Sequence, residues 1–122
     1  MRRANLSALG AKARVQALGR LRTGQMNGTE RAYGGVLELR RRGGEIAWYR
    51  FEGIKLRLAD NTFYTPDYAV MLTGGEIECH EVKGHWTDDA RVKIKVAAEM
   101  YPFRFIAVRK ERGGAFIEES FS

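Results

Sequence analysis

The hydrophobic pattern in the middle of the chain is that of β-strands. Between residues 45 and 83, four runs rich in aromatic and β-branched residues are separated by Glu52-Gly53, Asp60-Asn61 and Thr73-Gly74-Gly75. Runs of this kind, bounded by turn residues, are typical of strands joined by tight hairpins. The pattern therefore predicts an antiparallel meander with strands at 46–51, 54–59, 62–72 and 76–83.

A helical spacing precedes these strands. Thr29 is a good N-cap and Glu30 is favourably placed in the first turn, so we expect a helix from here to about Arg42. Tyr33 and Leu37 lie three and seven residues after Glu30 and share its face of the helix. The carboxylate of Glu30 is thereby predicted to face the packed side of the helix. A charged side chain is unfavourable there unless it has a partner or a function.

A second helix is predicted after the strands. Thr87 begins it, and Pro102 follows its end near Tyr101. Residues 103–108 then have the pattern of a buried strand, and residues 115–118 that of a short edge strand. The order helix, three or four strands, helix, strand predicts a mixed α/β sheet with helices packed on it.

Composition narrows the class of protein. The chain has 122 residues, which fits one compact domain. No run approaches the roughly 18 apolar residues of a membrane span. The single cysteine excludes an internal disulfide and a zinc cage built from several cysteines. These features predict a soluble protein of a reducing cytoplasm that does not contact membranes.

The net charge of +6 is concentrated near the N-terminus. Residues 1–29 hold six basic and no acidic residues, whereas the remainder holds fifteen of each sign. We therefore divide the chain into a basic arm, 1–28, and a domain, 29–122, and expect the arm to contact nucleic acid. A flexible terminus or an organelle transit peptide has the same composition, and both alternatives stay open. The candidate phosphate contacts of the arm are Arg14, Arg20 and Arg22.

The candidate chemistry lies in the last predicted hairpin. Glu81 and Lys83 share one face of their strand because side chains alternate. If Leu72 and Glu76 close a three-residue loop, stepping outward along the hairpin places Asp67 directly opposite Glu81, with Cβ atoms about 4.5 to 5.5 Å apart. A two-residue loop would send the two carboxylates to opposite faces unless a bulge intervened.

Two opposed carboxylates need a positive charge between them. Lys83 is one candidate and a divalent cation is the better one, since Mg²⁺ prefers oxygen ligands and takes one or two carboxylates together with substrate phosphate oxygens. Such an ion would position a phosphodiester and lower the pKa of a bound water. Lys83 would then orient the attacking water, help to deprotonate it, or offset transition-state charge, and the sequence does not choose among these roles.

These residues resemble a known signature. Pro66-Asp67, thirteen intervening residues and Glu81-Val82-Lys83 are similar to the motif of the PD-(D/E)XK nuclease superfamily. The segment Val82-Lys83-Gly84 and the Thr-started helix with Lys93 resemble its phage-borne branch, related to Holliday-junction resolvases. The likeness spans roughly residues 30–108. It implies a restriction-endonuclease-like core, a central mixed and largely antiparallel sheet flanked by helices in the order α-β-β-β-α-β.

The same resemblance implies residue roles. Asp67 and Glu81 would bind Mg²⁺ or Mn²⁺, Lys83 would complete the catalytic site, and Glu30 matches the acidic residue that often joins the metal from the first helix. Lys93 and His85 are candidate substrate contacts. The simpler alternatives are a surface ion pair for Glu81 and Lys83, a helix-dipole partner for Glu30, and a solvent-directed side chain for Lys93.

The resulting expectation is a divalent-metal-dependent endonuclease that hydrolyses DNA, with DNA favoured over RNA by the resemblance alone. If phage-encoded, it would act in the cytoplasm of a bacterial host cell. One alternative is a dimeric Holliday-junction resolvase, in which a homodimer pairs two active sites. The other is a basic nucleic-acid-binding protein without catalytic activity.

Overall fold

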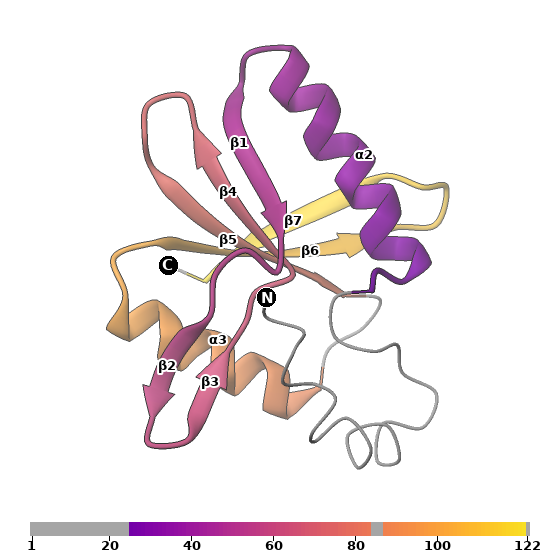
Figure 1. The fold of residues 1–122 in the computed structure, drawn as a ribbon. Coiled ribbons are helices and arrows are strands. Elements are labelled where there is room, and N and C mark those ends of the chain that lie inside the picture. The colour runs from indigo at the N-terminus through magenta and orange to yellow at the C-terminus, as the bar shows by residue number, and fades with distance from the viewer. Residues whose placement is uncertain (1–24, 84–86, 122) are drawn as a thin grey trace.

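The computed structural model describes residues 25–83 and 87–121. Figure 1 shows their path through two helices and seven strands. Their bounds are α2 (Gly28–Arg42), β1 (Ile46–Phe51), β2 (Leu56–Ala59), β3 (Thr62–Tyr64), β4 (Tyr68–Leu72), β5 (Ile77–Lys83), α3 (Asp88–Met100), β6 (Arg104–Lys110) and β7 (Phe116–Ser120). Within these described ranges, neither helix has the length and apolar character that crossing a membrane requires.

The predicted mixed α/β architecture is confirmed. Five strands form one sheet in the order β1-β4-β5-β6-β7, and β2 and β3 form a separate two-stranded sheet. Every neighbouring pair in the large sheet is antiparallel except β5 and β6, which are parallel and joined through α3. Helix α2 packs against β1 and β5, whereas α3 lies beside the β2–β3 hairpin (Figure 1).

The predicted meander of consecutive strand pairs is wrong. β1 pairs with β4 rather than with β2, and the run expected at 62–72 is divided between β3 in the small sheet and β4 in the large one. The division falls at residues 65–67, which include Pro66. Proline has no backbone N–H to give to a ladder, so the chain leaves one sheet there and enters the other.

The predicted register of the β4–β5 hairpin is confirmed. Tyr68 pairs with His80, and Leu72 N–H donates to Glu76 O at 2.9 Å, which closes a three-residue loop. Gly75 in that loop has φ +100°, a left-handed conformation that glycine adopts without steric cost. The register places Asp67, the residue before Tyr68, level with Glu81.

The predicted start of the first helix is wrong by two residues. Asn27, rather than Thr29, is the N-cap, and its side chain accepts a hydrogen bond from Glu30 N at 2.8 Å. The Glu30 carboxylate returns the contact by accepting from Asn27 N at 2.9 Å, which completes a capping box. An asparagine with a glutamate three residues later satisfies two N–H groups together, and this reciprocal pair sets the start of α2.

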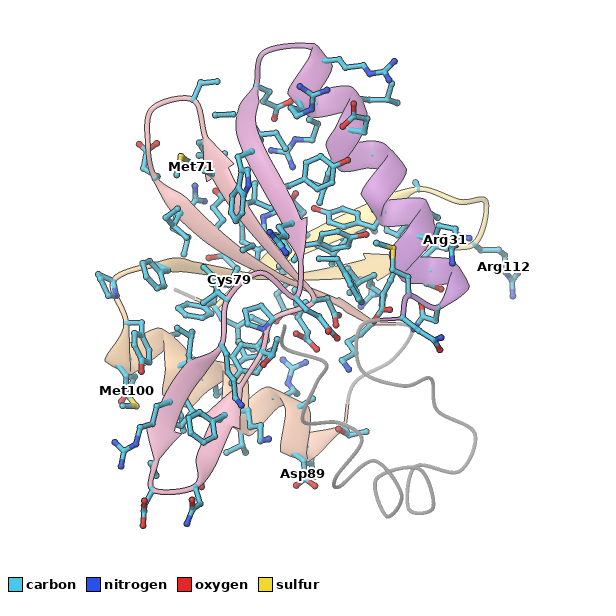
Figure 2. The ribbon with its side chains drawn as sticks, in the orientation of Figure 1. Arg31, Met71, Cys79, Asp89, Met100 and Arg112 are labelled. Carbon is cyan, nitrogen blue, oxygen red and sulfur yellow. The ribbon has the colours of Figure 1, made fainter. Side chains whose placement is uncertain are left out.

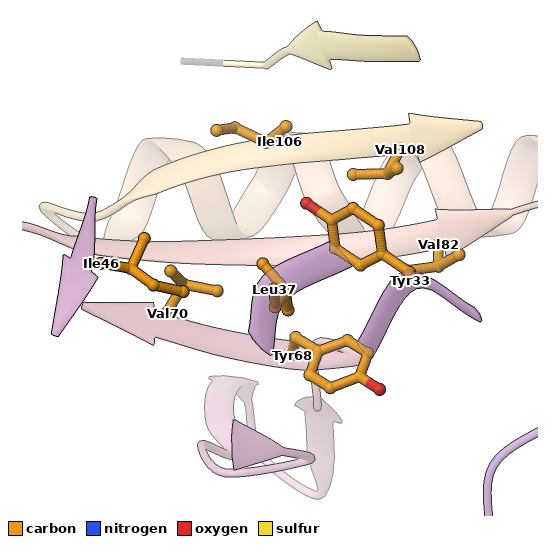
Figure 3. Packing of buried hydrophobic residues seen from close by; sticks show 8 residues of the cluster. All are labelled: Tyr33, Leu37, Ile46, Tyr68, Val70, Val82, Ile106 and Val108. Carbon is orange, nitrogen blue, oxygen red and sulfur yellow. The ribbon is translucent and has the colours of Figure 1, made fainter. Parts of the chain in front are cut away.

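Two apolar clusters hold the layers together on opposite faces of β5. The first joins α2 to the sheet and contains Tyr33 and Leu37, confirming the predicted packed face of this helix (Figure 3). The second joins α3 and the β2–β3 hairpin to the sheet through Leu56, Tyr64, Cys79, Ile94, Ala97 and Phe105. Because β5 lies in the middle of the sheet and is buried on both faces, polar side chains on it are enclosed on either side.

Candidate active site

The side chains of strand β5 point alternately to the two faces of the sheet. Cys79, Glu81 and Lys83 point toward α3 and the hairpin, whereas His80 and Val82 point toward α2, as alternation predicts. Cys79, labelled in Figure 2, is buried in the second cluster. Burial raises the pKa of its thiol to about 12, so Cys79 is a packing residue rather than a nucleophile.

Asp67 lies in the connection that leads into β4, not inside a strand as predicted. Its Oδ2 accepts a hydrogen bond from Val82 N at 2.7 Å, so the carboxylate crosses to β5 one residue after Glu81. Its own carbonyl accepts from Glu52 N at 2.8 Å. Glu52 has φ 50°, a left-handed conformation that is uncommon for a residue with a side chain. The turn after β1 thus anchors the backbone of Asp67.

Glu81 is buried and held by two side chains. Its Oε1 accepts a hydrogen bond from the Tyr64 hydroxyl at 2.7 Å, and its Oε2 lies 3.3 Å from Lys83 Nζ. The side chain of Lys83 keeps 34% of its exposure, which opens this end of the cluster to solvent. Asp67, Glu81 and Lys83 therefore converge, as the sequence predicts, with the ammonium on the solvent side.

The charge of this cluster is not balanced. Burial, followed by the negative charge of Glu81, raises the pKa of Asp67 to about 9. Burial also raises the pKa of Glu81, against the opposing effects of Tyr64 and Lys83. Since the two carboxyl groups also interact strongly, ionising both of them beside a single ammonium is unfavourable.

Glu30 approaches this cluster from α2 without joining it. The Tyr68 hydroxyl donates to Glu30 O at 2.8 Å, and the charge of Glu30 contributes to the raised pKa of Asp67. A Cβ at Gly34 would lie 2.5 Å from the Tyr68 hydroxyl, so the absence of a side chain there lets Tyr68 reach the helix. The Glu30 carboxylate itself is engaged in the capping box with Asn27.

The donor set suits a hard divalent cation that keeps most of its own water. Asp67 and Glu81 offer carboxylate oxygens, and Mg²⁺ is commonly held by one or two carboxylates completed by water and phosphate oxygens. Within residues 25–83 and 87–121, no three His, Cys, Asp or Glu side chains are grouped closely enough to hold a metal ion. The described cluster is thus a two-carboxylate pair, and Glu30 as third ligand stays a prediction.

Comparisons with known proteins give no information on the chemistry of this cluster. Nothing matches: no family model, no curated protein and no solved structure. The convergence of Asp67, Glu81 and Lys83 is therefore the observation from which a function has to be argued.

The predicted substrate contacts are only partly described. Lys93 lies on the exposed side of α3, and its Nζ donates to Phe63 O at 3.3 Å, which ties the helix to the hairpin. His85, Arg14, Arg20 and Arg22 lie outside the residues that the structure describes. Lys93 thus has a structural contact in addition to its predicted one with phosphate.

Tyr64 is the site residue that sequence reasoning missed. Nothing in the aromatic run at 62–72 marks Tyr64 as a site residue, and β3 is not a neighbour of β5 in a sheet. The available signal is chemical: a tyrosine at a buried strand position needs a partner for its hydroxyl, and the acids two strands away are the strongest acceptors nearby.

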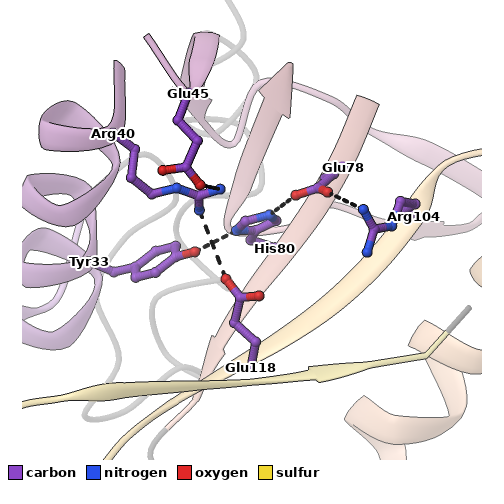
Figure 4. A network of polar contacts seen from close by, with 7 residues as sticks. All are labelled: Tyr33, Arg40, Glu45, Glu78, His80, Arg104 and Glu118. Carbon is purple, nitrogen blue, oxygen red and sulfur yellow. Dashed lines mark hydrogen bonds and ion pairs between the residues drawn. The ribbon is translucent and has the colours of Figure 1, made fainter. Parts of the chain in front are cut away.

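The opposite face of β5 carries a second buried polar group, which Figure 4 shows. His80 Nε2 lies 2.8 Å from Glu78 Oε1, and Tyr33 Oη lies 2.6 Å from His80 Nδ1. The hydrogen bond with His80 lowers the pKa of Glu78, and the Tyr33 hydroxyl pairs with the other ring nitrogen of His80. Arg104 completes the chain by donating to Glu78 Oε2 at 2.9 Å.

Proposed function

We propose that this protein is a divalent-metal-dependent endonuclease that hydrolyses phosphodiester bonds in DNA. The observation that carries the proposal is the convergence of Asp67 and Glu81 beside Lys83, where two buried carboxyl groups have a single ammonium to balance them if both ionise. The likeness of Pro66-Asp67 and Glu81-Val82-Lys83 to the PD-(D/E)XK motif supports the same reaction. The basic composition of residues 1–28 supports a nucleic-acid substrate.

Each residue of the cluster has a role in this proposal. Asp67 and Glu81 hold the cation, which when bound supplies a Lewis acid that orients the phosphate and offsets its developing charge. The Val82 N–H fixes one oxygen of Asp67 and leaves the other for the ion. Glu30 is the proposed third ligand, and to serve as one it has to exchange its bond with Asn27 N for the ion.

Lys83 acts on the solvent side of the pair. Its ammonium lies 3.3 Å from Glu81 Oε2 and neutralises part of the buried charge there. With a cation held by the two carboxylates, Lys83 would contact the attacking water or the phosphate oxygens. Lys93 and the arginines of the arm supply sequence-independent phosphate contacts, which fix the position of the duplex.

The experiment is a cleavage assay on the full chain with linear, single-stranded and four-way-junction DNA in Mg²⁺, Mn²⁺ or EDTA. We expect cutting in Mg²⁺ or Mn²⁺, none in EDTA, and a loss of roughly 10²-fold or more in Asp67→Asn. Glu76→Gln is the matched control, because Glu76 is an exposed acid at the turn of the same hairpin and should leave the rate unchanged.

The same assay separates the alternatives. Paired cuts restricted to the four-way junction, by a dimeric species, would identify a resolvase. DNA binding without cutting in every metal would overturn the enzymatic proposal and identify a nucleic-acid-binding protein.

A further inference from the structure

We propose that Tyr64 is a positioning residue for the cation site: its hydroxyl fixes the carboxylate of Glu81 in the orientation that binds the ion. The inference rests on the proposed function, since it concerns how one of the two proposed ligands is held. Tyr64 itself is not a ligand in this proposal and acts only through Glu81.

The geometry of the contact supports this role. The Tyr64 hydroxyl donates to Oε1 of Glu81 at 2.7 Å, and both residues are buried. Lys83, which lies 3.3 Å from Oε2 of Glu81, is by contrast a flexible, partly exposed group. The rigid phenol therefore restricts the rotation of the carboxylate more than the lysine does, which lowers the entropy lost when an ion binds.

The surroundings of Tyr64 show how its own position is fixed. The β2–β3 hairpin stands outside the large sheet, so ladder hydrogen bonds do not connect it to β5. Lys93 of α3 and Tyr101, the residue that follows α3, hold it instead: Lys93 donates to Phe63 O, and the Tyr101 hydroxyl donates to Arg57 O. With Tyr64 packed in the second apolar cluster, the hairpin presents its hydroxyl to Glu81 from a fixed direction.

The chain offers a matched pair of variants. Tyr64→Phe removes the hydroxyl that contacts Glu81, and Tyr101→Phe removes a hydroxyl that contacts the same hairpin without touching Glu81. Mn²⁺ affinity is measured by titration calorimetry with MnCl₂ alone, so the readout does not depend on cleavage. Cleavage at saturating Mn²⁺ and the denaturation midpoint are measured on the same samples.

We expect Tyr64→Phe to weaken Mn²⁺ binding about tenfold, the size typical of a lost hydrogen bond to a charged group. Cleavage at saturating Mn²⁺ should stay within about threefold of wild type, because excess ion compensates for the looser carboxylate. Tyr101→Phe should keep the wild-type Mn²⁺ affinity. If both variants lower the denaturation midpoint alike but only Tyr64→Phe weakens binding, hairpin docking alone is excluded as the cause.

Two results would overturn the inference while leaving the proposed function in place. One is a Tyr64→Phe protein with wild-type Mn²⁺ affinity, and the other is an equal loss of affinity in both variants. A wild-type protein that binds no Mn²⁺ and cuts no DNA would instead overturn the proposed function, and the inference with it.

Discussion

The two faces of strand β5 carry buried polar groups of similar size, but the charges of these groups are balanced differently. Toward α2, Glu78 is ionised between His80 and Arg104, and hydrogen bonding lowers its pKa. Toward the hairpin, Asp67 and Glu81 share one ammonium, and burial raises the pKa of both. The two groups are only one residue apart along the chain.

This difference in charge balance distinguishes a polar group that stabilises the fold from one that is suited to bind an ion. A buried carboxylate with its own cationic and hydrogen-bonding partners needs no further ligand. Removing it lowers the free energy of unfolding. Two carboxylates that one ammonium cannot balance are destabilising until a proton or a cation joins them. We therefore expect changes on the α2 face to alter folding and changes on the hairpin face to alter ion binding and cleavage.

The largest expected effect is on catalysis by Lys83. Lys83→Met should lower the cleavage rate roughly 10²- to 10³-fold, because in the proposed reaction the ammonium of Lys83 acts on the reacting groups. Mn²⁺ binding by calorimetry should persist, since both carboxylates remain. Lys95→Met, which removes an exposed ammonium from α3, is the control and should cut at the wild-type rate. A Lys83→Met protein with full activity would contradict the proposal that the polar group on the hairpin face of β5 is catalytic.

The second effect concerns the α2 face. Glu78→Ala leaves His80 without its acceptor and Arg104 without its counter-charge, and should lower the free energy of unfolding by about 3 kcal/mol. Urea denaturation of the full chain measures this change. Cleavage per folded molecule should remain close to wild type. Unchanged stability with lost cleavage would show that the two faces do not divide as proposed.

The third effect is a pH dependence of stability without divalent ions. Because the folded protein holds the Asp67 proton to about pH 9, whereas an unperturbed aspartate has a pKa of 3.8, folding is favoured most below pH 4. This contribution is lost as the pH rises toward 9. Asp67→Asn, which cannot ionise, should therefore gain stability over wild type in EDTA by up to about 1.4 kcal/mol for each pH unit above about 4.

Unfolding curves at several pH values measure this difference. The gap between Asp67→Asn and wild type should close near pH 4, and added Mn²⁺ should stabilise the wild type at pH 8. A gap that stays constant from pH 4 to pH 9 would show that Asp67 does not titrate as its surroundings require.

The smallest effect distinguishes the roles of Glu30. Glu30→Gln keeps an oxygen that can accept from Asn27 N, so the free energy of unfolding should fall by no more than about 0.5 kcal/mol. As a third ligand with a negative charge, Glu30 should matter more for cleavage, which we expect to fall about tenfold in limiting Mg²⁺. Equal cleavage by wild type and Glu30→Gln would leave Glu30 as a helix cap alone.

The sequence predicts those features of the site that depend on residues close together in the chain. The β4–β5 register follows from a three-residue loop with Gly75 in a left-handed conformation, and this register brings Asp67 level with Glu81. The packed face of α2 likewise follows from the spacing of Tyr33 and Leu37. These features depend on residues close in sequence, for which turn chemistry and periodicity are sufficient.

The part that the sequence does not predict depends on distant pairing. Period-two alternation fits a strand in either sheet, so it cannot tell that the chain crosses from β3 to β4 at Pro66 or that β1 pairs with β4. For the same reason, the contact of Tyr64 with Glu81 cannot be found from alternation. The start of α2 was missed because Asn27 and Thr29 are both good caps, and only the reciprocal bond with Glu30 distinguishes them.

The most direct test is the anomalous scattering of Mn²⁺ in crystals of this protein. If Asp67 and Glu81 form a cation site, the map should show a peak in contact with a carboxylate oxygen of each, and this peak should vanish in Asp67→Asn. Saturating Mn²⁺ that produces no peak between these two side chains, or a peak that persists in Asp67→Asn, would contradict it.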